Sequence, residues 1–332
     1  MSNASPAETL RFAKYEGLGN DFIVVDASAP DVFDRSLARA EVVAAICDRH
    51  RGIGADGLLL AGVIHGVPFM RVLNADGSEP EMCGNGLRCV ALHLARTGQL
   101  PERAETESAQ TEGTQTEGTH TLIFDTGAGP HGVTLHAVGE SGVVEVQMRA
   151  PSLVPSAVPV CALAPLVDAP LEVDGHTLRV TAVSMGNPHV VTFDVLSVAE
   201  RLALGPRLER DARFPEGVNV GFAQMTASDA LTLHVFERGV GWTEACGTGA
   251  CAAAVAAVES GRAERGRTLR VALPGGTLLV RVGAPGASVY MTGPARHVFD
   301  GTLALDVFQG SLALDVFQGS LALDARVSVG AA

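Results

Sequence analysis

Two short stretches, Met82-Cys83-Gly84-Asn85-Gly86 and Ala245-Cys246-Gly247-Thr248-Gly249, share one pattern and lie 163 positions apart, counted from Cys83 to Cys246. Each places a cysteine before a glycine-rich turn that leads into small apolar residues. The pattern predicts a cysteine at the N-terminus of a helix, where free N–H groups and the helix dipole stabilise a thiolate and also bind a carboxylate. The duplication indicates two matched thiol acid/bases that face one carbon atom.

The segments around each cysteine follow one order: strands, turn, cysteine, helix, strands. Strand-like apolar runs lie at 22–26, 58–61 and 69–73 in the first half, and at 178–183, 189–193, 218–224 and 231–237 in the second. After Cys83, apolar residues recur at helical spacing, whereas residues 248–260 are apolar on every side and predict a buried central helix. Further helices are expected at 37–49 and 195–204. We predict an α/β fold of two similarly built halves with the ligand between them.

The overall composition indicates a soluble globular chain with a large core. The chain has 332 residues, is 47% hydrophobic and carries a formal charge of −13. Partners such as nucleic acid or an anionic membrane surface need clusters of Lys and Arg, so no nucleic-acid or membrane partner is expected and a small molecule is favoured. No basic head followed by an apolar run, and no membrane-length apolar segment, is present, so a cytoplasmic location is expected.

The cysteines and the lysine limit the chemistry. Six cysteines in a chain of this length without a secretory signal are expected to be free thiols. Cys89 and Cys251 have neither CxxC nor zinc-site spacing and are expected in the core, so no metal site is predicted. Lys14 is the single lysine and lies before the first strand-like run, outside any phosphate-binding turn. A pyridoxal-phosphate enzyme binds its cofactor through a lysine, so this mechanism is disfavoured.

Six motifs in order carry a family resemblance. They are Gly17-Leu-Gly-Asn-Asp-Phe22, Asn74-Ala-Asp-Gly-Ser78, Met82-Cys-Gly-Asn-Gly-Leu-Arg-Cys89, Met185-Gly-Asn-Pro-His189, Gly217-Val-Asn-Val-Gly221, and Glu237-Arg-Gly-Val-Gly241 with Ala245-Cys-Gly-Thr-Gly-Ala-Cys251. From about 12 to 299 the chain resembles the diaminopimelate epimerase family of PLP-independent amino-acid racemases. The resemblance implies conversion of LL-2,6-diaminopimelate to the meso isomer, a step toward lysine and peptidoglycan, by two bases and without a cofactor. It also implies a homodimer, and two pseudo-symmetric domains with a mixed, curved sheet around a central helix.

The resemblance also implies a role for each matched residue. Cys83 and Cys246 would be the catalytic base and acid, with His189 and Glu237 tuning their pKa values. The substrate-binding positions implied are Asn20, Asn74, Gly84, Asn85, Asn187, Asn219, Glu237, Arg238, Gly247 and Thr248. Backbone amides after each cysteine suit the α-carboxylate of the substrate, and the planar guanidinium of Arg238 suits its distal carboxylate.

Domain limits follow from composition and from the resemblance together. We expect a disordered leader at 1–9, an N-terminal domain at 10–150 and a C-terminal domain at 151–296. Residues 101–120 are polar and read as an insertion of low complexity. Residues 297–306 are expected to return to the first domain as a strand. A nine-residue unit at 298–306 recurs twice by 324, so 307–332 is expected to be a repeated tail rather than a calcium-binding repeat.

Two alternatives remain open at this point. A proline or hydroxyproline racemase would use the same chemistry, but that group has His where Asn85 stands and lacks Glu-Arg-Gly before the second cysteine. A thiol redox or binding protein would join the two cysteines as a disulfide. Two positions depart from the family pattern: Gly57 replaces a polar side chain, and Trp242 stands where many relatives have Glu, at a place where it would shape the mouth of the site.

Overall fold

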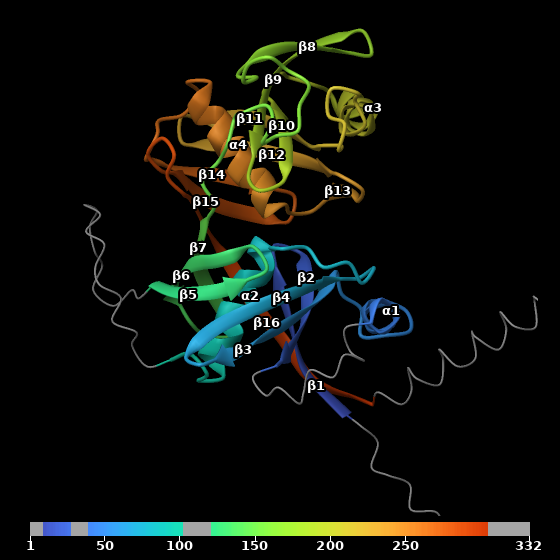
Figure 1. The fold of residues 1–332 in the computed structure, drawn as a ribbon, viewed down its shortest axis with the longest axis vertical. Helices are drawn as coiled ribbons and strands as arrows, with labels where there is room; N and C mark the ends of the chain where they lie inside the picture. Colours follow the sequence, from blue (N-terminus) through green and yellow to red (C-terminus); the bar gives the residue numbers. More distant parts are fainter. Residues whose placement is uncertain (1–8, 28–38, 102–120, 305–332) are drawn as a thin grey trace, which may run out of the picture.

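The computed structural model describes residues 9–27, 39–101 and 121–304, which form two lobes stacked along the long axis of the molecule (Figure 1). The first lobe contains β1 (Thr9–Gly17), β2 (Asn20–Asp26), α1 (Ala40–Cys47), β3 (Gly57–Ile64), β4 (Val67–Asn74), α2 (Gly84–Arg96), β5 (Thr121–Thr126), β6 (Gly129–Ala137) and β7 (Ser141–Met148). The second contains β8 (Ala169–Val173), β9 (His176–Ser184), β10 (Pro188–Thr192), α3 (Val198–Glu209), β11 (Asn219–Ala227), β12 (Ala230–Glu237), β13 (Gly241–Thr243), α4 (Gly247–Glu259), β14 (Thr268–Leu273) and β15 (Gly276–Val282). The last strand, β16 (Val289–Ala304), belongs to both.

The two lobes repeat one strand topology. From β1 to β7, successive neighbours in the sheet pair antiparallel, parallel, antiparallel, parallel, antiparallel and antiparallel. The series from β9 through β10, β11, β12, β14 and β15 to β16 gives the same six relations in the same order. In each lobe the two parallel pairs are joined through a helix, as a parallel connection requires. The predicted α/β class with two pseudo-symmetric domains is confirmed.

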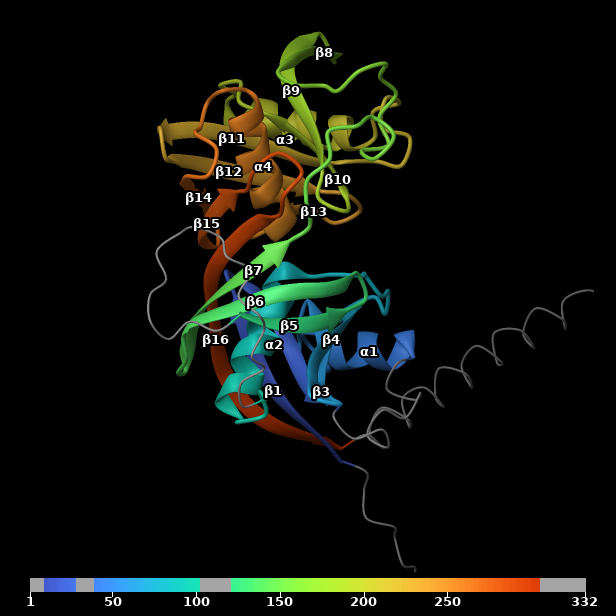
Figure 2. The same ribbon diagram turned by 60° about the vertical axis from the view of Figure 1, so that its left-hand side comes forward.

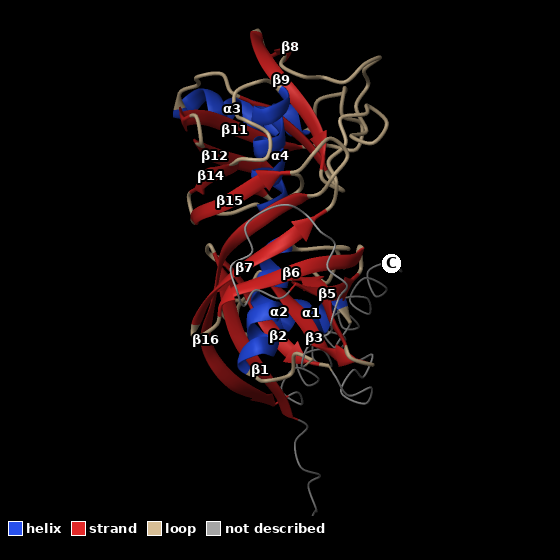
Figure 3. Cartoon of the chain, turned by 90° about the vertical axis from the view of Figure 1, so that its left-hand side faces the viewer, coloured by secondary structure: helices blue, strands red, loops and turns tan. Residues whose placement is uncertain are grey.

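Helices α2 and α4 lie inside the lobes, surrounded by strands (Figure 3), whereas α1 and α3 lie outside (Figure 1). The position of each helix follows from its composition. Residues 250–257 of α4 are all fully buried, because alanine, cysteine and valine leave no polar face. Cys89 and Cys251 are likewise fully buried, as expected, and all six cysteines are free thiols. One apolar cluster surrounds α2 and α4 together, so the two lobes share a core.

Strand β16 joins the lobes into one sheet, in which the sixteen described strands are hydrogen-bonded. It runs along both lobes (Figure 2). It pairs with β15 in the second lobe over 289–292, with β7 over 289–296 and with β1 over 296–304. Because β1 pairs with β2 on its other side, these contacts close the first lobe into a barrel around α2. The exact domain limits remain a prediction.

Two details differ from the sequence-based expectation. Lys14 does not precede the first strand but lies within β1, where it is buried and forms an ion pair with Asp21 at 2.5 Å. Helix α3 continues past Pro206 to Glu209, because Leu204 and Leu208 pack against the core under it. Apart from Thr9 and Pro101, the expected leader at 1–9 and insertion at 101–120 lie outside the described residues, as does the tail at 307–332.

Candidate active site

The two cysteines occupy equivalent places at the N-termini of the two central helices. Cys83 is the N-cap of α2 with φ −137° and ψ 110°, and Cys246 is the N-cap of α4 with φ −121° and ψ 108°. In each case the sulfur accepts a hydrogen bond at 3.3 Å from the backbone N–H three residues later, on Gly86 and Gly249. The sequence pattern thus has the structural basis that it predicted, a thiol at each helix start.

Burial opposes ionisation of both thiols. Cys246 is 5% exposed and Cys83 is half-buried. Loss of water raises the pKa of each thiol, and this effect outweighs the hydrogen bonds from the helix amides, which lower it. The helix amides thus stabilise the thiolate form, as the sequence pattern predicts, but burial has the larger effect on the pKa of each thiol.

A hydrogen-bonded chain leads from His189 to Cys246. The imidazole Nε2 lies 3.0 Å from Asn187 Oδ1, Asn187 Nδ2 donates to Thr248 Oγ1 at 3.3 Å, and Thr248 Oγ1 lies 3.6 Å from the sulfur of Cys246. An amide oxygen only accepts, so Nε2 carries the proton. Burial, with a further contribution from the Arg238 charge, lowers the pKa of His189 to about 3, so the ring is neutral. His189 is thus linked to Cys246 through two intermediate side chains.

Glu237 lies beside Cys246, and its charge also affects the pKa of Cys83. It ends β12, and its Oε1 accepts a hydrogen bond at 2.6 Å from Thr243 on the neighbouring strand β13. The carboxylate charge raises the pKa of Cys246 and, as a smaller effect, that of Cys83. One acidic side chain therefore biases both thiols toward the protonated form.

In the first lobe, Asn20 and Asn85 form a pair of amides. Asn85 is buried and donates from Nδ2 to Asn20 Oδ1 at 3.3 Å, while Asn20 Nδ2 donates to Asp56 at 2.6 Å. The Asn85 Oδ1 atom has no hydrogen-bond partner among the described residues and lies 3.4 Å from where a Cβ on Gly247 would stand. The pair thus reaches the start of α4 in the other lobe.

The remaining predicted binding residues lie at strand ends around these helices. Asn74 ends β4 and donates to Ser78 at 2.9 Å. Asn219 begins β11, where its side chain accepts from the backbone N–H of Arg238 at 3.0 Å. The Arg238 guanidinium is exposed and donates to the Glu216 carbonyl at 2.8 Å. Within the described residues, no side-chain hydrogen bond joins Asn74 or the Arg238 guanidinium to a cysteine.

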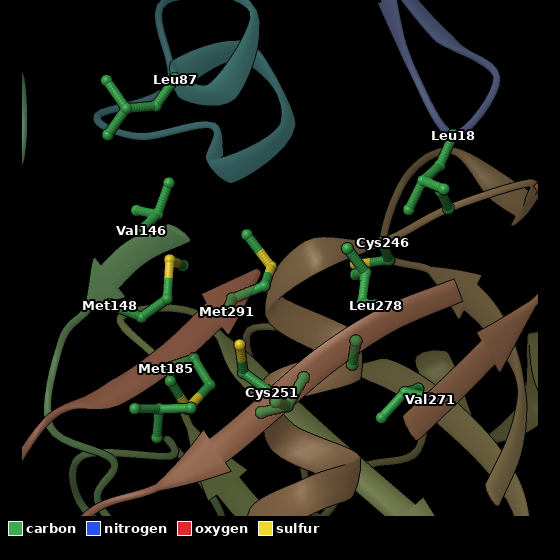
Figure 4. Close-up of a cluster of buried hydrophobic side chains, with 14 of the residues drawn as sticks. Leu18, Leu87, Val146, Met148, Met185, Cys246, Cys251, Val271, Leu278 and Met291 are labelled. Atoms are coloured by element: carbon green, nitrogen blue, oxygen red, sulfur yellow. The ribbon is translucent and has the colours of Figure 1, made fainter. Parts of the chain in front are cut away.

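Met291 of β16 lies between the two helix starts. A Cβ added to Gly84 would stand 2.7 Å from Met291 Cε, and one added to Gly247 would stand 3.1 Å from Met291 Sδ. Glycine after each cysteine therefore lets both helix termini approach the same side chain. Figure 4 shows Met291 with Met148, Met185 and Cys251 in the apolar cluster that continues from one lobe into the other.

The sequence analysis did not identify three residues that contact the predicted site residues and hold them in place. Asp56, in the turn before β3, binds Asn20 and sets which end of its amide faces Asn85. Thr243 holds Glu237, and Met291 separates the helix starts. An Asp within a glycine-rich turn is a signal that could have drawn attention to Asp56, whereas Met291 offers no local signal.

The two departures from the family pattern have structural explanations. A Cβ at Gly57 would stand 2.7 Å from the Leu73 carbonyl oxygen, so this position has little room for a side chain. Trp242 packs against Phe222 and Phe236, with ring centroids 5.7 and 5.4 Å away, and lies against Gly205 of α3. Its indole therefore braces the strand that carries Glu237.

Within residues 9–27, 39–101 and 121–304, no three His, Cys, Asp or Glu side chains gather in a way that could hold a metal ion. None of the described helices is long and apolar enough to cross a membrane.

The comparison with known sequences decides the family. A sequence profile described as Diaminopimelate epimerase matches residues 12–154 and 181–298, which include both capping cysteines. The chain belongs to the diaminopimelate epimerase family. It is 42% identical over 301 residues to diaminopimelate epimerase 1 of Nostoc sp. strain PCC 7120, covering 89% of this chain and 99% of that protein. It is 40% identical over 303 residues to the diaminopimelate epimerase of Neisseria meningitidis, covering 89% and 98%.

Solved structures share the fold at low sequence identity. A hydroxyproline epimerase from Agrobacterium vitis superposes with a TM-score of 0.62 at 14% identity, covering 90% of this chain and 93% of that chain. A phenazine biosynthesis protein of the PhzF family from Bacillus anthracis gives 0.61 at 16% identity, covering 89% and 99%. This chain therefore shares its fold with these two proteins.

Proposed function

We propose that this chain converts LL-2,6-diaminopimelate to the meso isomer by a two-base mechanism in which Cys83 and Cys246 act on opposite faces of one α-carbon. The observation that carries the proposal is the equivalence of the two cysteines, which cap the two central helices with matching backbone angles and matching sulfur hydrogen bonds. Membership of the diaminopimelate epimerase family supports the substrate.

The proton transfer needs one thiolate and one thiol. The thiolate takes the α-proton, which leaves the electron pair on the α-carbon, and the opposite thiol donates its own proton to that carbon from the other face. Configuration is inverted, and the two sulfurs exchange charge states. The reverse reaction begins from the exchanged state, so no external oxidant, reductant or cofactor takes part.

The α-carboxylate would bind between the helix starts. The first N–H groups of a helix have no partner within it, and Gly84, Asn85, Gly247 and Thr248 supply such groups from two helices. Negative charge that develops next to the α-carbon is stabilised by the same amides. Cys246 is almost fully buried, so little water reaches it. Electrostatic interactions are stronger where water is excluded.

The distal end of diaminopimelate carries an ammonium and a carboxylate group. Arg238 suits the carboxylate through its planar guanidinium, while Asn20, Asn74, Asn187 and Asn219 offer amides that donate or accept. Glu237 offers a carboxylate to the ammonium, and His189 holds Asn187 and Thr248 in position at Cys246. A homodimer in the cytoplasm, without a nucleic-acid or membrane partner, completes the proposal.

The test is isotope exchange with defined variants. LL-diaminopimelate in deuterated buffer with reductant, and without pyridoxal phosphate, is expected to gain deuterium at the α-carbon as the meso isomer appears. Cys83→Ser and Cys246→Ser should each lower conversion by about 10²- to 10⁴-fold, because a hydroxyl is a poor base at neutral pH. Cys161→Ser, which changes an exposed cysteine elsewhere, is the matched control.

The outcome discriminates between the candidate functions. Turnover of proline or hydroxyproline with no exchange of diaminopimelate would replace the proposal with the related racemase activity. Full conversion in either of the two serine variants would contradict the two-base mechanism, because inversion needs a base on one face of the carbon and an acid on the other.

A further inference from the structure

Arg88 is a buried cation that the mechanism above leaves unused. It lies in α2, five residues after Cys83, and is 0% exposed. Its Nε donates to the Pro294 carbonyl at 3.0 Å, and Nη1 lies 3.9 Å from Met291 Sδ. Nη2 has no hydrogen-bond partner in the described part of the chain, and no carboxylate there forms an ion pair with the guanidinium. A charge buried in this way is costly to the fold, which indicates a role beyond packing.

The backbone makes room for this guanidinium. A Cβ at Gly17 of β1 would stand 3.3 Å from Arg88 Nη2, and a Cβ at Gly293 of β16 would stand 3.2 Å from Arg88 Cζ. Two strands therefore have glycine where the side chain passes. The absence of a side chain at these two positions leaves room for the planar guanidinium of Arg88.

Arg88 breaks the symmetry of the two central helices. Counted from the capping cysteine, the fifth residue is Arg88 in α2 and Cys251 in α4. Neither helix has an acidic residue in its first turn. The surroundings of the two thiols thus match in backbone conformation and in cap, but only the helix that Cys83 caps has a cation at this fifth position.

The charges around the two sulfurs act in opposite directions. A helical side chain extends toward the N-terminus of its own helix, which carries the guanidinium back toward Cys83. The Arg88 charge lowers the pKa of Cys83, as do the amides of Asn85 and Gly86, while Glu237 raises it slightly. At Cys246, Glu237 is the leading charge and raises the pKa.

The other thiols that face Arg88 remain protonated. Cys89 and Cys251 are fully buried, and burial raises the pKa of Cys251 to about 12 and that of Cys89 further. The remaining charge that the guanidinium meets is Glu16 on β1. The guanidinium interacts most strongly with Cys89 and next with Cys83, and since burial keeps Cys89 protonated, Cys83 is the thiol of the proposed mechanism that its charge reaches.

We propose that the Arg88 guanidinium stabilises negative charge on the Cys83 sulfur, so that Cys83 is the first of the two thiols to lose its proton. The proton passes to solvent, and Cys246 keeps its own beside Glu237. This inference rests on the proposed two-cysteine function, and it makes Arg88 a positioning residue that acts through Cys83. The catalytic cycle then begins with Cys83 as the thiolate and Cys246 as the thiol.

The test measures ionisation of each thiol without substrate. Alkylation by iodoacetamide is followed from about pH 7 to about pH 11.5, because burial raises the pKa of both thiols above the usual value, with the modified cysteine located by peptide mass, in a chain that carries Cys161→Ser throughout. With Cys246→Ser as background, Arg88→Met should raise the alkylation midpoint of Cys83 by about one pH unit or more, and Arg88→Lys should keep it near the original value. Arg96→Met removes a cation from the far end of α2 and should leave the midpoint unchanged.

Two results would overturn the proposal. One is an unchanged midpoint in Arg88→Met, or an Arg88→Lys variant that behaves like Arg88→Met, since the charge would then be irrelevant. The other needs no change at Arg88: the Cys83 midpoint in Cys246→Ser must lie below the Cys246 midpoint in Cys83→Ser, and the reverse order refutes the assignment even if Arg88→Met does not fold. Alkylation requires no diaminopimelate, so a chain inactive on that substrate would still report the order.

Discussion

His189 is a histidine whose neutrality is imposed by its surroundings. It is 1% exposed, and its ring holds Asn187, which in turn holds Thr248. A charged ring would need water that the site does not admit, so the pKa falls to about 3. We therefore propose that His189 orients hydrogen bonds at Cys246 rather than carrying charge.

The same shift predicts a pH dependence of stability. The unfolded chain binds a proton on this histidine below about pH 6.5, whereas the folded chain does not until about pH 3. The contribution of the neutral His189 to the free energy of unfolding is thus fully present above pH 6.5 and is lost as the pH falls toward 3. Between pH 7.5 and pH 5 this loss amounts to about 2 kcal/mol. Urea unfolding at these two pH values should show a difference smaller by about this amount in His189→Gln. The exposed His50→Gln variant should keep the original difference, and equal differences in both variants would contradict the assignment.

At this scale the sequence predicted the positions of the site well but not the state of the thiols. Cysteine followed by Gly-X-Gly specifies a helix cap locally, and Cys83 and Cys246 both form one. Their pKa values depend on burial and on Glu237, which arrives from another strand. The local pattern correctly predicts that the helix amides lower the pKa of each thiol, but it contains no information on desolvation, which raises that pKa more.

Helix α3 illustrates how an element is held by its ends and by its apolar face. Ser197 and Glu200 form a capping box, in which Ser197 Oγ accepts from the Glu200 N–H at 3.3 Å and Glu200 Oε2 accepts from the Ser197 N–H at 2.7 Å. The helix then passes Pro206, which lacks an N–H, and continues to Glu209. The cap and the packing of its leucines compensate for the bond that proline removes.

Loss of this cap should destabilise the second lobe. Ser197→Ala removes the side-chain acceptor and is expected to lower the free energy of unfolding by about 1 kcal/mol. Thermal unfolding should then shift downward by about 2 °C. Ser228→Ala, at an exposed turn after β11, serves as the control, and an equal shift in both variants would show that the cap contributes nothing.

The pattern of elements was predicted better than their limits. The two central helices stand where apolar spacing placed them, because short-range periodicity decides a helix. Strand β1 escaped notice because Arg11, Lys14 and Glu16 interrupt its apolar residues. One of its two pairing partners is the adjacent β2, but the other, β16, lies almost three hundred positions away. The predicted end of this helix at residue 204 was wrong, because packing of Leu204 and Leu208 against the core carries α3 past Pro206.

Across the whole molecule, the lobes are held in register by a close backbone contact. The turn between β1 and β2 places Leu18 against Gly275 and Gly276 at the start of β15, and Gly275 N–H donates to the Glu244 carbonyl at 2.9 Å. A methyl group on Gly275 would overlap the Leu18 carbonyl oxygen. Asn20 follows Leu18 by two residues, so this contact sets how the first lobe presents its amides to α4.

Gly275→Ala should therefore impair catalysis more than folding. The added methyl meets backbone, which has no rotamer to change, and it would move the β1–β2 turn away from the second lobe. A displacement of about 1 Å at a reacting site lowers kcat/KM by about 10²-fold. Gly139→Ala is the control, because its added Cβ would meet nothing closer than 3.5 Å. Full kcat/KM in Gly275→Ala would show that the turn does not position the site.

The shared strand β16 has a consequence for the order in which the protein is made. The first lobe leaves the ribosome with both β1 and β7 lacking a neighbour, because their common partner, residues 289–304, is synthesised after the second lobe. Exposed strand edges attract other chains. The lobe that is translated first is thus completed last, and premature termination before residue 289 would release a chain with an open barrel, an obvious substrate for chaperones and proteases.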